Sequence, residues 1–414
     1  MRPESRGPRS GRGVSENLRS VWVSGYALAV SSPSANSTKS VVIVGAGVIG
    51  LAHALTAREA GWAVTVLERD GRPLGASVRN FGTLWPIGCA AGAEREQALF
   101  GVRRWRELAA EAGFWLKPQG SLSLAYREEA WAVLREFTAG GGGEGEFQLL
   151  EPEEVLRRFP AANPEGLRGA LFSPAETVMH PPSAIAALAR LVAARGAEVH
   201  FGTPVVKVHE DAVETSDGRR FPFDQLVIAA GDEMRLLFPA ELAAAQLRRC
   251  QLQMMRSVPQ PAGFDLGAIF VSDLTLGHYP AFRDCPSTAA LRARMEAELP
   301  RHREWGVHVI AAQHPDGALV LGDSHEYGAD FDPDLRADVE ALILAALSDF
   351  VRVPDRRIAA RWHGVYLKST VGQMQVVLRP RERVTMVTAM GGLGMTLSWG
   401  LARKTVESWQ NDAA

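Results

Sequence analysis

Tyr366 and Lys368 stand two positions apart in the stretch RWHGVYLKST, which begins at residue 361. In a β-strand, residues at this spacing point to the same face of the sheet. A phenol and an ammonium on one face can bind a tetrahedral dianion, because lysine acts on phosphate-like groups as a point charge. The alternative is a tyrosine that packs in the core beside a solvated lysine. The anion-binding interpretation requires other parts of the chain to place a cofactor beside this strand.

A dinucleotide-binding motif is carried by the stretch SVVIVGAGVIGLAHALTAREAGWAVTVLERD. Its apolar run from Val41 to Val44 predicts a strand buried on both faces, followed by a helix to about Ala60 and a second strand from Ala63 to Leu67. Glycines at G-x-G-x-x-G spacing allow a tight turn, a close approach to a pyrophosphate and helix–strand packing. Glu68 can accept hydrogen bonds from a ribose 2′-hydroxyl and argues against NADP. The order of these parts predicts an adenine-dinucleotide site, with a ligand-free structural βαβ unit as the alternative.

Three later features favour FAD over NAD. The apolar strand DQLVIAAG (residues 224–231) ends in small residues and follows an acid-bearing hairpin. The glycines of GGLGMTLS (residues 391–398) open a C-terminal helix whose N–H groups can face ribityl or pyrimidine oxygens. The stretch GRPLGASVRNFGTLWPIG (residues 71–88) is polar where a plain dehydrogenase would continue into a crossover helix. Each feature alone is also compatible with an ordinary turn or loop, but together with the first motif they favour FAD.

Three stretches, GAGVIGLAHALTAREAGWAVTVLER, DQLVIAAG and GGLGMTLSWG, resemble the D-amino-acid oxidase, glycine oxidase and sarcosine oxidase family. The likeness covers roughly residues 40 to 410. The stretches ASVRNFGTLWPIG and WHGVYLKSTVGQ resemble a bacterial subgroup that acts on amines of the 2-aminoethylphosphonate type. The resemblance implies an α/β fold, in which a discontinuous Rossmann-like FAD-binding domain begins with a βαβ unit and carries an inserted α+β substrate domain with an antiparallel sheet. The predicted FAD-binding domain comprises residues 40–89, 175–244 and 361–414, and the predicted substrate domain comprises residues 90–174 and 245–360.

The resemblance also implies the reaction. Non-covalently bound FAD would take hydride at N5 from the carbon next to an amine nitrogen, leaving an imine that water hydrolyses. The substrate amine must be neutral and its carbon held close to N5. A dedicated general base is not required, and the sequence shows no convincing Ser/His/Asp or Cys/His triad. Oxygen or another acceptor would reoxidise the flavin.

The site residues follow from matching this sequence to the family, position by position. The loop with Arg79 and Asn80 is predicted to lie against the flavin ring, where Arg79 would steady the flavin or reach the substrate, with a structural salt bridge as the alternative. The backbone of Val206 is predicted to contact adenine. His180 is a further substrate-binding candidate, with a turn histidine as the alternative. The full set of predicted cofactor-binding residues is Gly45, Ala46, Gly47, Val48, Ile49, Gly50, Glu68, Arg69, Ser77, Arg79, Asn80, Phe81, Gly82, Val206, Ala230, Gly231, Gly392, Leu393, Gly394, Met395 and Thr396.

The stretch RWHGVYLKST departs from the family pattern at one position that bears on the substrate. Amino-acid oxidases of this family grip the substrate carboxylate with an arginine in a W-x-G-x-R-P pattern. The match here begins at Trp362, so that Tyr366 takes the arginine position and a leucine replaces the proline. This departure argues against a simple α-amino acid. It favours Tyr366 and Lys368 as a clamp for the phosphonate of 2-aminoethylphosphonate or its N-methyl derivative.

Composition excludes several other classes of protein. The formal charge of the 414 residues is -2 and no basic block is present, so a nucleic acid partner is not expected. No run reaches the 18 or so apolar residues of a membrane span. Three scattered cysteines fit neither a disulfide framework nor a zinc site, so the sequence predicts no metal and a reducing, cytoplasmic location. Residues 1–39 are rich in Arg, Gly, Pro and Ser. They are predicted to be a disordered extension, or the result of a start codon placed too early, with a signal peptide as the alternative.

Two other functions stay open at this level. Within enzymes, the chain could be a glycine- or sarcosine-type amino-acid oxidase whose carboxylate ligand comes from elsewhere. From another class, it could be a flavin- or NAD-binding protein without turnover. The oligomeric state is not indicated by the sequence.

Overall fold

The first apolar strand of the chain, β1, lies inside a six-stranded sheet. The computed structural model describes residues 38–140 and 147–411, so the predicted extension lies almost wholly outside the described residues, as does most of the glycine run that follows Ala139. The strand order is β20-β21-β13-β1-β2-β9, parallel except for the edge strand β20. The bounds are β1 Ser40–Val44, β2 Ala63–Leu67, β9 Glu198–His200, β13 Gln225–Ile228, β20 Val376–Arg381 and β21 Val384–Thr388.

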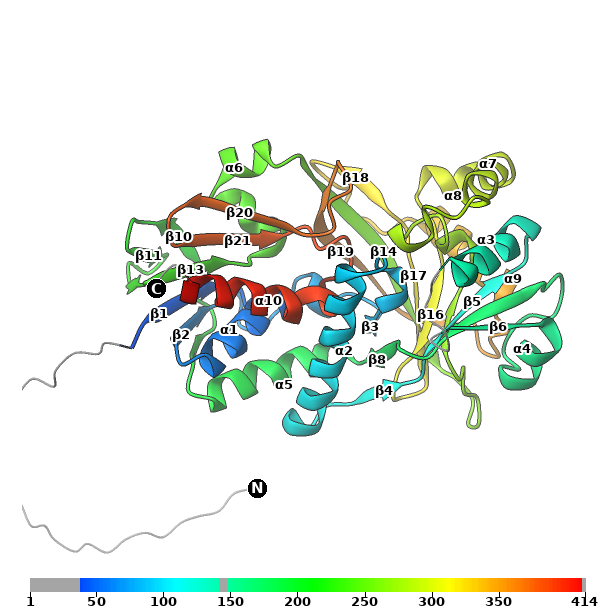
Figure 1. Cartoon of the computed structure of the whole chain (residues 1–414), viewed down its shortest axis with the longest axis horizontal. Helices are drawn as coiled ribbons and strands as arrows, with labels where there is room; N and C mark the ends of the chain where they lie inside the picture. Colours follow the sequence, from blue (N-terminus) through cyan, green and yellow to red (C-terminus); the bar gives the residue numbers. More distant parts are fainter. Residues whose placement is uncertain (1–37, 141–146, 412–414) are drawn as a thin grey trace, which may run out of the picture. The chain divides into compact units, whose positions relative to one another are not determined.

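Both faces of this sheet are covered, as the unbroken apolar pattern of β1 requires. Val41 and Ile43 pack in the cluster formed with the helices, whereas Val42 and Val44 pack in the cluster beneath a three-stranded hairpin sheet. In Figure 1 the red helix α10 runs beside α1, and α2 crosses it. The elements of the two covering layers are α1 Val48–Glu59, α2 Ala93–Ala112, α5 Pro181–Ala194 and α10 Gly394–Asn411, and β10 Val205–Val208, β11 Ala212–Thr215, β12 Arg220–Pro222 and α6 Pro239–Ala244.

A second, nine-stranded sheet builds the other side of the described chain (Figure 1). Its path is β18-β14-β17-β16-β15-β5-β7-β6, with β19 on the second edge of β14, and its pairs are antiparallel except for β15 with β5. The strands are β5 Ser121–Ala125, β6 Gln148–Leu150, β7 Gly169–Ser173, β14 Leu247–Pro259, β15 Ile269–Val271, β16 Ile310–Gln313, β17 Ala318–Gly322, β18 Glu326–Gly328 and β19 Ile358–Ser369. The remaining helices are α3 Glu128–Ala139, α4 Pro152–Arg158, α7 Thr288–Glu298, α8 Pro300–Glu304 and α9 Ala337–Phe350, and a small sheet joins β3 Thr83–Leu84, β4 Leu116–Pro118 and β8 Thr177–Met179.

The long antiparallel pair β14–β19 contains the stretch RWHGVYLKST, which lies on β19. Tyr366 lies opposite Cys250, and Lys368 lies opposite Arg248. Because the two residues are separated by two positions in one strand, they share a face of the sheet, as predicted. A lysine side chain on this strand can therefore act on the same space as the tyrosine.

The predicted fold class is confirmed, since the described chain combines a mostly parallel sheet covered on both faces with a mostly antiparallel sheet. Two segments lie elsewhere than the predicted domain bounds imply. Residues 361–369 pair within the large sheet, and α2 packs against α10 and α5 beside the parallel sheet. The described residues from Thr38 onward form one compact unit, so the predicted division into two domains stays a prediction. No helix among the described residues combines the length and the apolar character needed to cross a membrane.

Candidate active site

The glycine turn after β1 has the geometry that its motif predicts. Gly45 has a φ of +103°, and a Cβ added there would lie 2.5 Å from the carbonyl oxygen of Ala229. A Cβ on Gly50 would meet the carbonyl oxygen of Gly45, which keeps α1 close to the strand. A Cβ on Gly47 would stand 3.0 Å from Ser77 Oγ. The turn therefore needs glycine for its backbone angle, for helix packing and for the close approach of a neighbouring group.

Glu68 closes the end of β2, where the motif expects an acidic residue. Its Oε2 accepts the Ala46 N–H at 2.8 Å, and its Oε1 accepts the Asp70 N–H at 3.1 Å. Glu68 is only 8% exposed and lines the large cavity of this structure. These two hydrogen bonds hold the carboxylate beside the glycine turn, in the position that suits a ribose hydroxyl.

A short 3-10 turn, η1 (Ala76–Val78), covers the glycine turn. Ser77 Oγ accepts the Val48 N–H at 2.9 Å, and Asn80 Nδ2 donates to the carbonyl oxygens of Ala76 and Ser77. Asn80 Oδ1 also accepts the Gly82 N–H at 2.8 Å, so this amide shapes the turn. Arg79 is exposed, and its Nη1 donates to the carbonyl oxygen of His363 at 3.2 Å. The turn is thereby tied to β19.

The loop before α10 approaches the same space from the other side. Gly391 and Gly392 have φ angles of +58° and +85°, a conformation that glycine adopts at little cost. A Cβ on Gly392 would lie 3.4 Å from the hydroxyl of Tyr366. The phenol therefore lies directly over the loop that opens the helix. Its place beside a cofactor stays a prediction.

One cavity of about 430 Å³ connects these parts. At one end it is lined by Val206 and Leu236, which are 55% and 68% exposed although both are apolar. Exposed apolar side chains of this kind suit a flat aromatic ring such as adenine. At the other end the cavity passes under the large sheet, where Leu252 and Met254 of β14 and Tyr366 of β19 form part of its roof.

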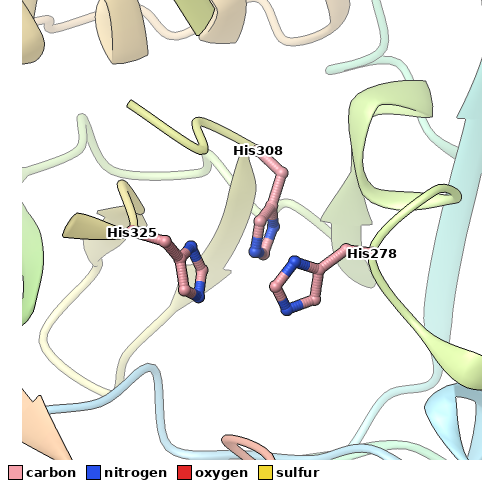
Figure 2. A group of neighbouring side chains, drawn as sticks. All are labelled: His278, His308 and His325. Carbon is pink, nitrogen blue, oxygen red and sulfur yellow. The ribbon is translucent and has the colours of Figure 1, made fainter. Parts of the chain in front are cut away.

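The roof also holds a polar cluster from three separate loops. His278 lies between the turns η4 (Asp273–Thr275) and η5 (Pro280–Phe282), His308 precedes β16, and His325 lies between β17 and β18. Figure 2 shows the three rings gathered around a common space. Asp323, two residues before His325, lines the cavity beside them. Asp323, His308 and His325 are each 4 or 5% exposed.

Burial dominates the electrostatics of this cluster. It raises the pKa of Asp323 to about 8, while the charge of Lys368 opposes that rise. It lowers the pKa of His308 to about 3 and the pKa of His278 and His325 well below the ordinary value, so the rings stay neutral at physiological pH. Burial also lowers the pKa of Lys368, whose Nζ donates to the Tyr327 hydroxyl at 3.3 Å. It raises the pKa of Tyr366 well above its usual range, which keeps the phenol protonated.

Most predicted site residues meet at this cavity, and a few do not line it. Those on the lining are Gly45, Gly47, Val48, Ile49, Glu68, Arg69, Ser77, Arg79, Asn80, Phe81, Val206, Ala230, Gly231, Tyr366, Gly392, Leu393, Gly394 and Met395. Ala46, Gly50, Gly82 and Thr396 lie just behind it; Thr396 Oγ1, for example, accepts the Trp85 N–H at 2.9 Å. Lys368 does not line the cavity, and its Nζ donates to the Tyr327 hydroxyl at 3.3 Å. His180 is not brought to the lining: its Nδ1 is 3.0 Å from Ser183 Oγ and its ring packs on His314.

Apart from Tyr366, sequence reasoning missed the residues that form the roof. Leu252, Met254 and the three clustered histidines come from segments with no shared motif. The one usable signal was the pair Asp323 and His325 in GDSHEYG, where a charged residue and a histidine directly follow an apolar strand. His308 comes beside them through the pairing of β16 with β17, and His278 through the packing of the loop before η5.

Comparison with known proteins decides the family. The family model described as FAD dependent oxidoreductase matches residues 40–408, nearly the whole described chain. The chain belongs to this family. It is therefore an FAD-dependent oxidoreductase, as the resemblance implied. The glycine turn, the held carboxylate, the exposed apolar end of the cavity and the glycine loop before α10 all fit that cofactor.

Individual relatives cover only part of this oxidoreductase. It is 29% identical over 178 residues to the mitochondrial sarcosine dehydrogenase of Homo sapiens, covering 42% of this chain and 19% of that protein. It is 30% identical over 206 residues to the glycine oxidase of Geobacillus kaustophilus (strain HTA426), covering 46% of this chain and 54% of that protein. The chain thus spans between about a fifth and about half of the length of these two curated relatives.

Solved structures extend the likeness of the fold to the whole oxidoreductase. The crystal structure of glycine oxidase from Geobacillus kaustophilus matches with a TM-score of 0.71 and 22% identity, covering 90% of this chain and 95% of that one. L-proline dehydrogenase from P.horikoshii matches with a TM-score of 0.72 and 18% identity, covering 91% and 94%. At these identities the match establishes the shared architecture.

Proposed function

We propose that this FAD-dependent oxidoreductase oxidises the C–N bond of a small amine that carries a phosphonate group, such as 2-aminoethylphosphonate or its N-methyl derivative. The observation that carries the proposal is the composition of the roof. Tyr366, Asp323 and the three histidines line the cavity there and are buried or half-buried. Lys368 does not line the cavity, but it is half-buried on the same strand face as Tyr366. Polar groups in such number serve a strongly charged substrate group rather than an apolar one.

The amine part of the proposal draws on the relatives. Sarcosine dehydrogenase and glycine oxidase are named for small amines, and both resemble this chain over part of their length. FAD, when bound, supplies the acceptor for one hydride, which carries two electrons and one proton. The substrate loses one hydrogen from carbon and one from nitrogen, and water adds to the resulting C=N bond to release a carbonyl compound and ammonia or a primary amine. Oxygen or another two-electron acceptor completes the cycle.

The roof also explains how the chain would hold such a substrate. Leu252 is 9% exposed and Met254 is fully buried, so the apolar part of the roof excludes water from the reacting carbon. The buried phenol of Tyr366 stays protonated and can donate a hydrogen bond to an anionic oxygen. The neighbouring ammonium of Lys368 adds a positive charge behind it.

The phosphonate part rests on what replaces the arginine of amino-acid oxidases. Two arginines line the cavity, and each already has a partner in the protein. Arg79 donates to the carbonyl oxygen of His363, and Arg69 forms ion pairs with Asp70 and Glu233. A planar carboxylate favours the fork of an arginine, whereas a tetrahedral dianion accepts separate single donors. Tyr366 and Lys368 are donors of the second kind.

The test is anaerobic reduction of the bound flavin by a panel of amines. The panel comprises 2-aminoethylphosphonate, its N-methyl derivative, glycine and sarcosine, and the loss of flavin absorbance is followed. We expect the phosphonates to bleach the flavin at much lower concentration than the amino acids. Lys368→Met and Tyr366→Phe should raise the concentration needed for half-maximal reduction by about tenfold to a hundredfold, as expected for a lost hydrogen bond to a charged group.

Lys117→Met is the matched control, because Lys117 is a partly exposed lysine that pairs with Asp265 away from the cavity. It should leave the reduction unchanged. Bleaching by glycine or sarcosine alone would replace the phosphonate with a carboxylate substrate. A flavin that none of these amines reduces would contradict an amine oxidoreductase of this kind.

A further inference from the structure

The three clustered histidines have the arrangement of metal ligands. His278, His308 and His325 each offer a ring nitrogen, and these nitrogens all lie within 4.8 Å of one another. The ring centroids are 4.1, 4.7 and 4.9 Å apart, and Figure 2 shows the rings facing a shared space. Within residues 38–140 and 147–411, this is the group of His, Cys, Asp and Glu side chains that is compact enough to hold an ion.

The hydrogen bonds around the cluster leave lone pairs pointing into it. His325 Nδ1 lies 3.2 Å from the carbonyl oxygen of Gly306, an acceptor that requires a proton on Nδ1 and so leaves Nε2 with a free lone pair. Orientation of a ring by a backbone carbonyl is the usual support of a metal-binding histidine. Neither nitrogen of His308 has a hydrogen-bond partner among the described residues, although this side chain is almost fully buried.

A carboxylate lies beside two of the three rings. Asp323 Oδ1 lies 3.3 Å from His308 Nε2 and 3.9 Å from His325 Nδ1, and it has no hydrogen-bond partner in the described chain. Buried polar atoms without partners are costly, and native proteins pair them with protein groups, water or ions. Three adjacent imidazolium ions would repel one another strongly at these separations. A cation bound between neutral rings satisfies the lone pairs and the carboxylate together.

We propose that His278, His308, His325 and Asp323 bind a divalent transition-metal ion of the Zn²⁺ type in the roof of the cavity. Imidazole nitrogens with a carboxylate oxygen are the donors that such ions select. A position left open toward the cavity would take an oxygen of the substrate phosphonate, and this role, unlike the metal site itself, rests on the proposed function.

Charge balance supports that role. With a metal bound, Asp323 is ionised in spite of its raised pKa, so this carboxylate and a phosphonate dianion together bring three negative charges into a buried site, where Lys368 supplies one positive charge. Lys368 is close enough to act there, because its Nζ contacts the hydroxyl of Tyr327, whose ring centroid is 6.4 Å from that of His325. A divalent cation supplies the two charges that are missing, and buried charges persist only when they are paired.

The experiment measures zinc binding by the FAD-loaded protein after chelator treatment and desalting. Wild type should bind one Zn²⁺ per chain by calorimetry and by elemental analysis. His308→Ala and His325→Ala should weaken that binding by about tenfold to a hundredfold or more. His209→Ala is the matched control, since His209 pairs with Glu214 on the hairpin sheet and does not line the cavity. Flavin content and thermal unfolding are recorded first, and Asp323→Asn replaces any alanine variant that does not fold.

Absence of zinc binding in wild type, or equal binding by His308→Ala, would overturn the proposal. Binding of inorganic phosphate by the metal-free protein in place of zinc, lost in His308→Ala, would overturn it in favour of a direct oxyanion site. The substrate role is tested separately, by adding zinc to the anaerobic reduction. We expect zinc to lower the half-maximal concentration of 2-aminoethylphosphonate by about tenfold and to leave that of sarcosine unchanged.

The two proposals fail in different ways. Zinc binding at the cluster without reduction by any aminophosphonate would leave the metal site standing and refute the phosphonate substrate. Equal reduction by aminophosphonates with and without zinc would refute the metal's role and leave the substrate standing.

Discussion

Glu176 should make the stability of this oxidoreductase depend on pH. The side chain is fully buried below the cavity wall, where Oε1 accepts the Ile87 N–H at 3.0 Å and Oε2 accepts the Ser121 hydroxyl at 3.1 Å. No cationic group pairs with this carboxyl among the described residues. Burial raises its pKa to about 7, above the usual 4.5, and the hydrogen bonds only partly offset that rise.

The sign and size follow from linkage between proton binding and folding. The folded state holds the proton more tightly than the unfolded chain, so the stabilisation is complete below pH 4.5 and is lost as pH rises, levelling off above about pH 7. Between pH 5.5 and pH 8.5 this single group should lower the free energy of unfolding by about 2 kcal/mol. Glu176→Gln keeps the shape but cannot ionise, so it should remove that part of the pH dependence.

The assay is urea unfolding of wild type and Glu176→Gln at both pH values with the same excess of FAD. The free energy of unfolding of the variant, relative to wild type, should rise by about 2 kcal/mol from pH 5.5 to pH 8.5. Glu165→Gln, on an exposed turn, is the control and should show no such change. Parallel pH profiles for wild type and Glu176→Gln would refute the reasoning, because they would mean that Glu176 ionises equally easily in the folded and unfolded states.

Two further predictions concern glycines. Gly45→Ala places a Cβ 2.5 Å from the Ala229 carbonyl oxygen at a φ of +103°, so the FAD content of the purified variant, measured by absorbance, should fall severely. Gly71→Ala is the control: its Cβ would have no atom within 4 Å, so this variant should retain the flavin. Gly101→Ala should lower the free energy of unfolding by about 1–3 kcal/mol, because its Cβ would meet the Thr396 carbonyl oxygen where α2 crosses α10. Helix propensity alone predicts the opposite sign, a gain of about 1 kcal/mol, so the urea midpoint distinguishes the two effects.

Local sequence patterns predicted much of the cofactor site. The apolar run of β1, the glycine spacing and Glu68 lie within one segment, and the Ala46 N–H and the Glu68 carboxylate, 22 residues apart, contact each other inside it. That is why the predicted strand, helix and strand appear as β1, α1 and β2 with nearly the expected bounds. The turn that holds Ser77 and Asn80 is likewise closed by hydrogen bonds within four residues.

The substrate end of the cavity could not be assembled in that way. Lys368 was predicted beside Tyr366 from strand spacing alone, but its contact with Tyr327 depends on β18 and β19 lying against the same strand, β14. His180 had the right residue type but lies at the start of α5, where it contacts Ser183 and His314. The prediction of no metal considered cysteine spacing, whereas the ligands now proposed are histidines.

The sequence by itself determined the dinucleotide fold, because the buried parallel strand, the glycine turn and the acidic strand end all lie within one segment, residues 40–68. Tertiary structure alone decided the roof of the cavity. His278, His308 and His325 lie 30 and 17 residues apart along the chain, so nothing local relates them. They meet because β16 and β17 pair within the large sheet and the loop before η5 packs against that pair, and burial in that place makes their chemistry differ from that of a histidine on the surface.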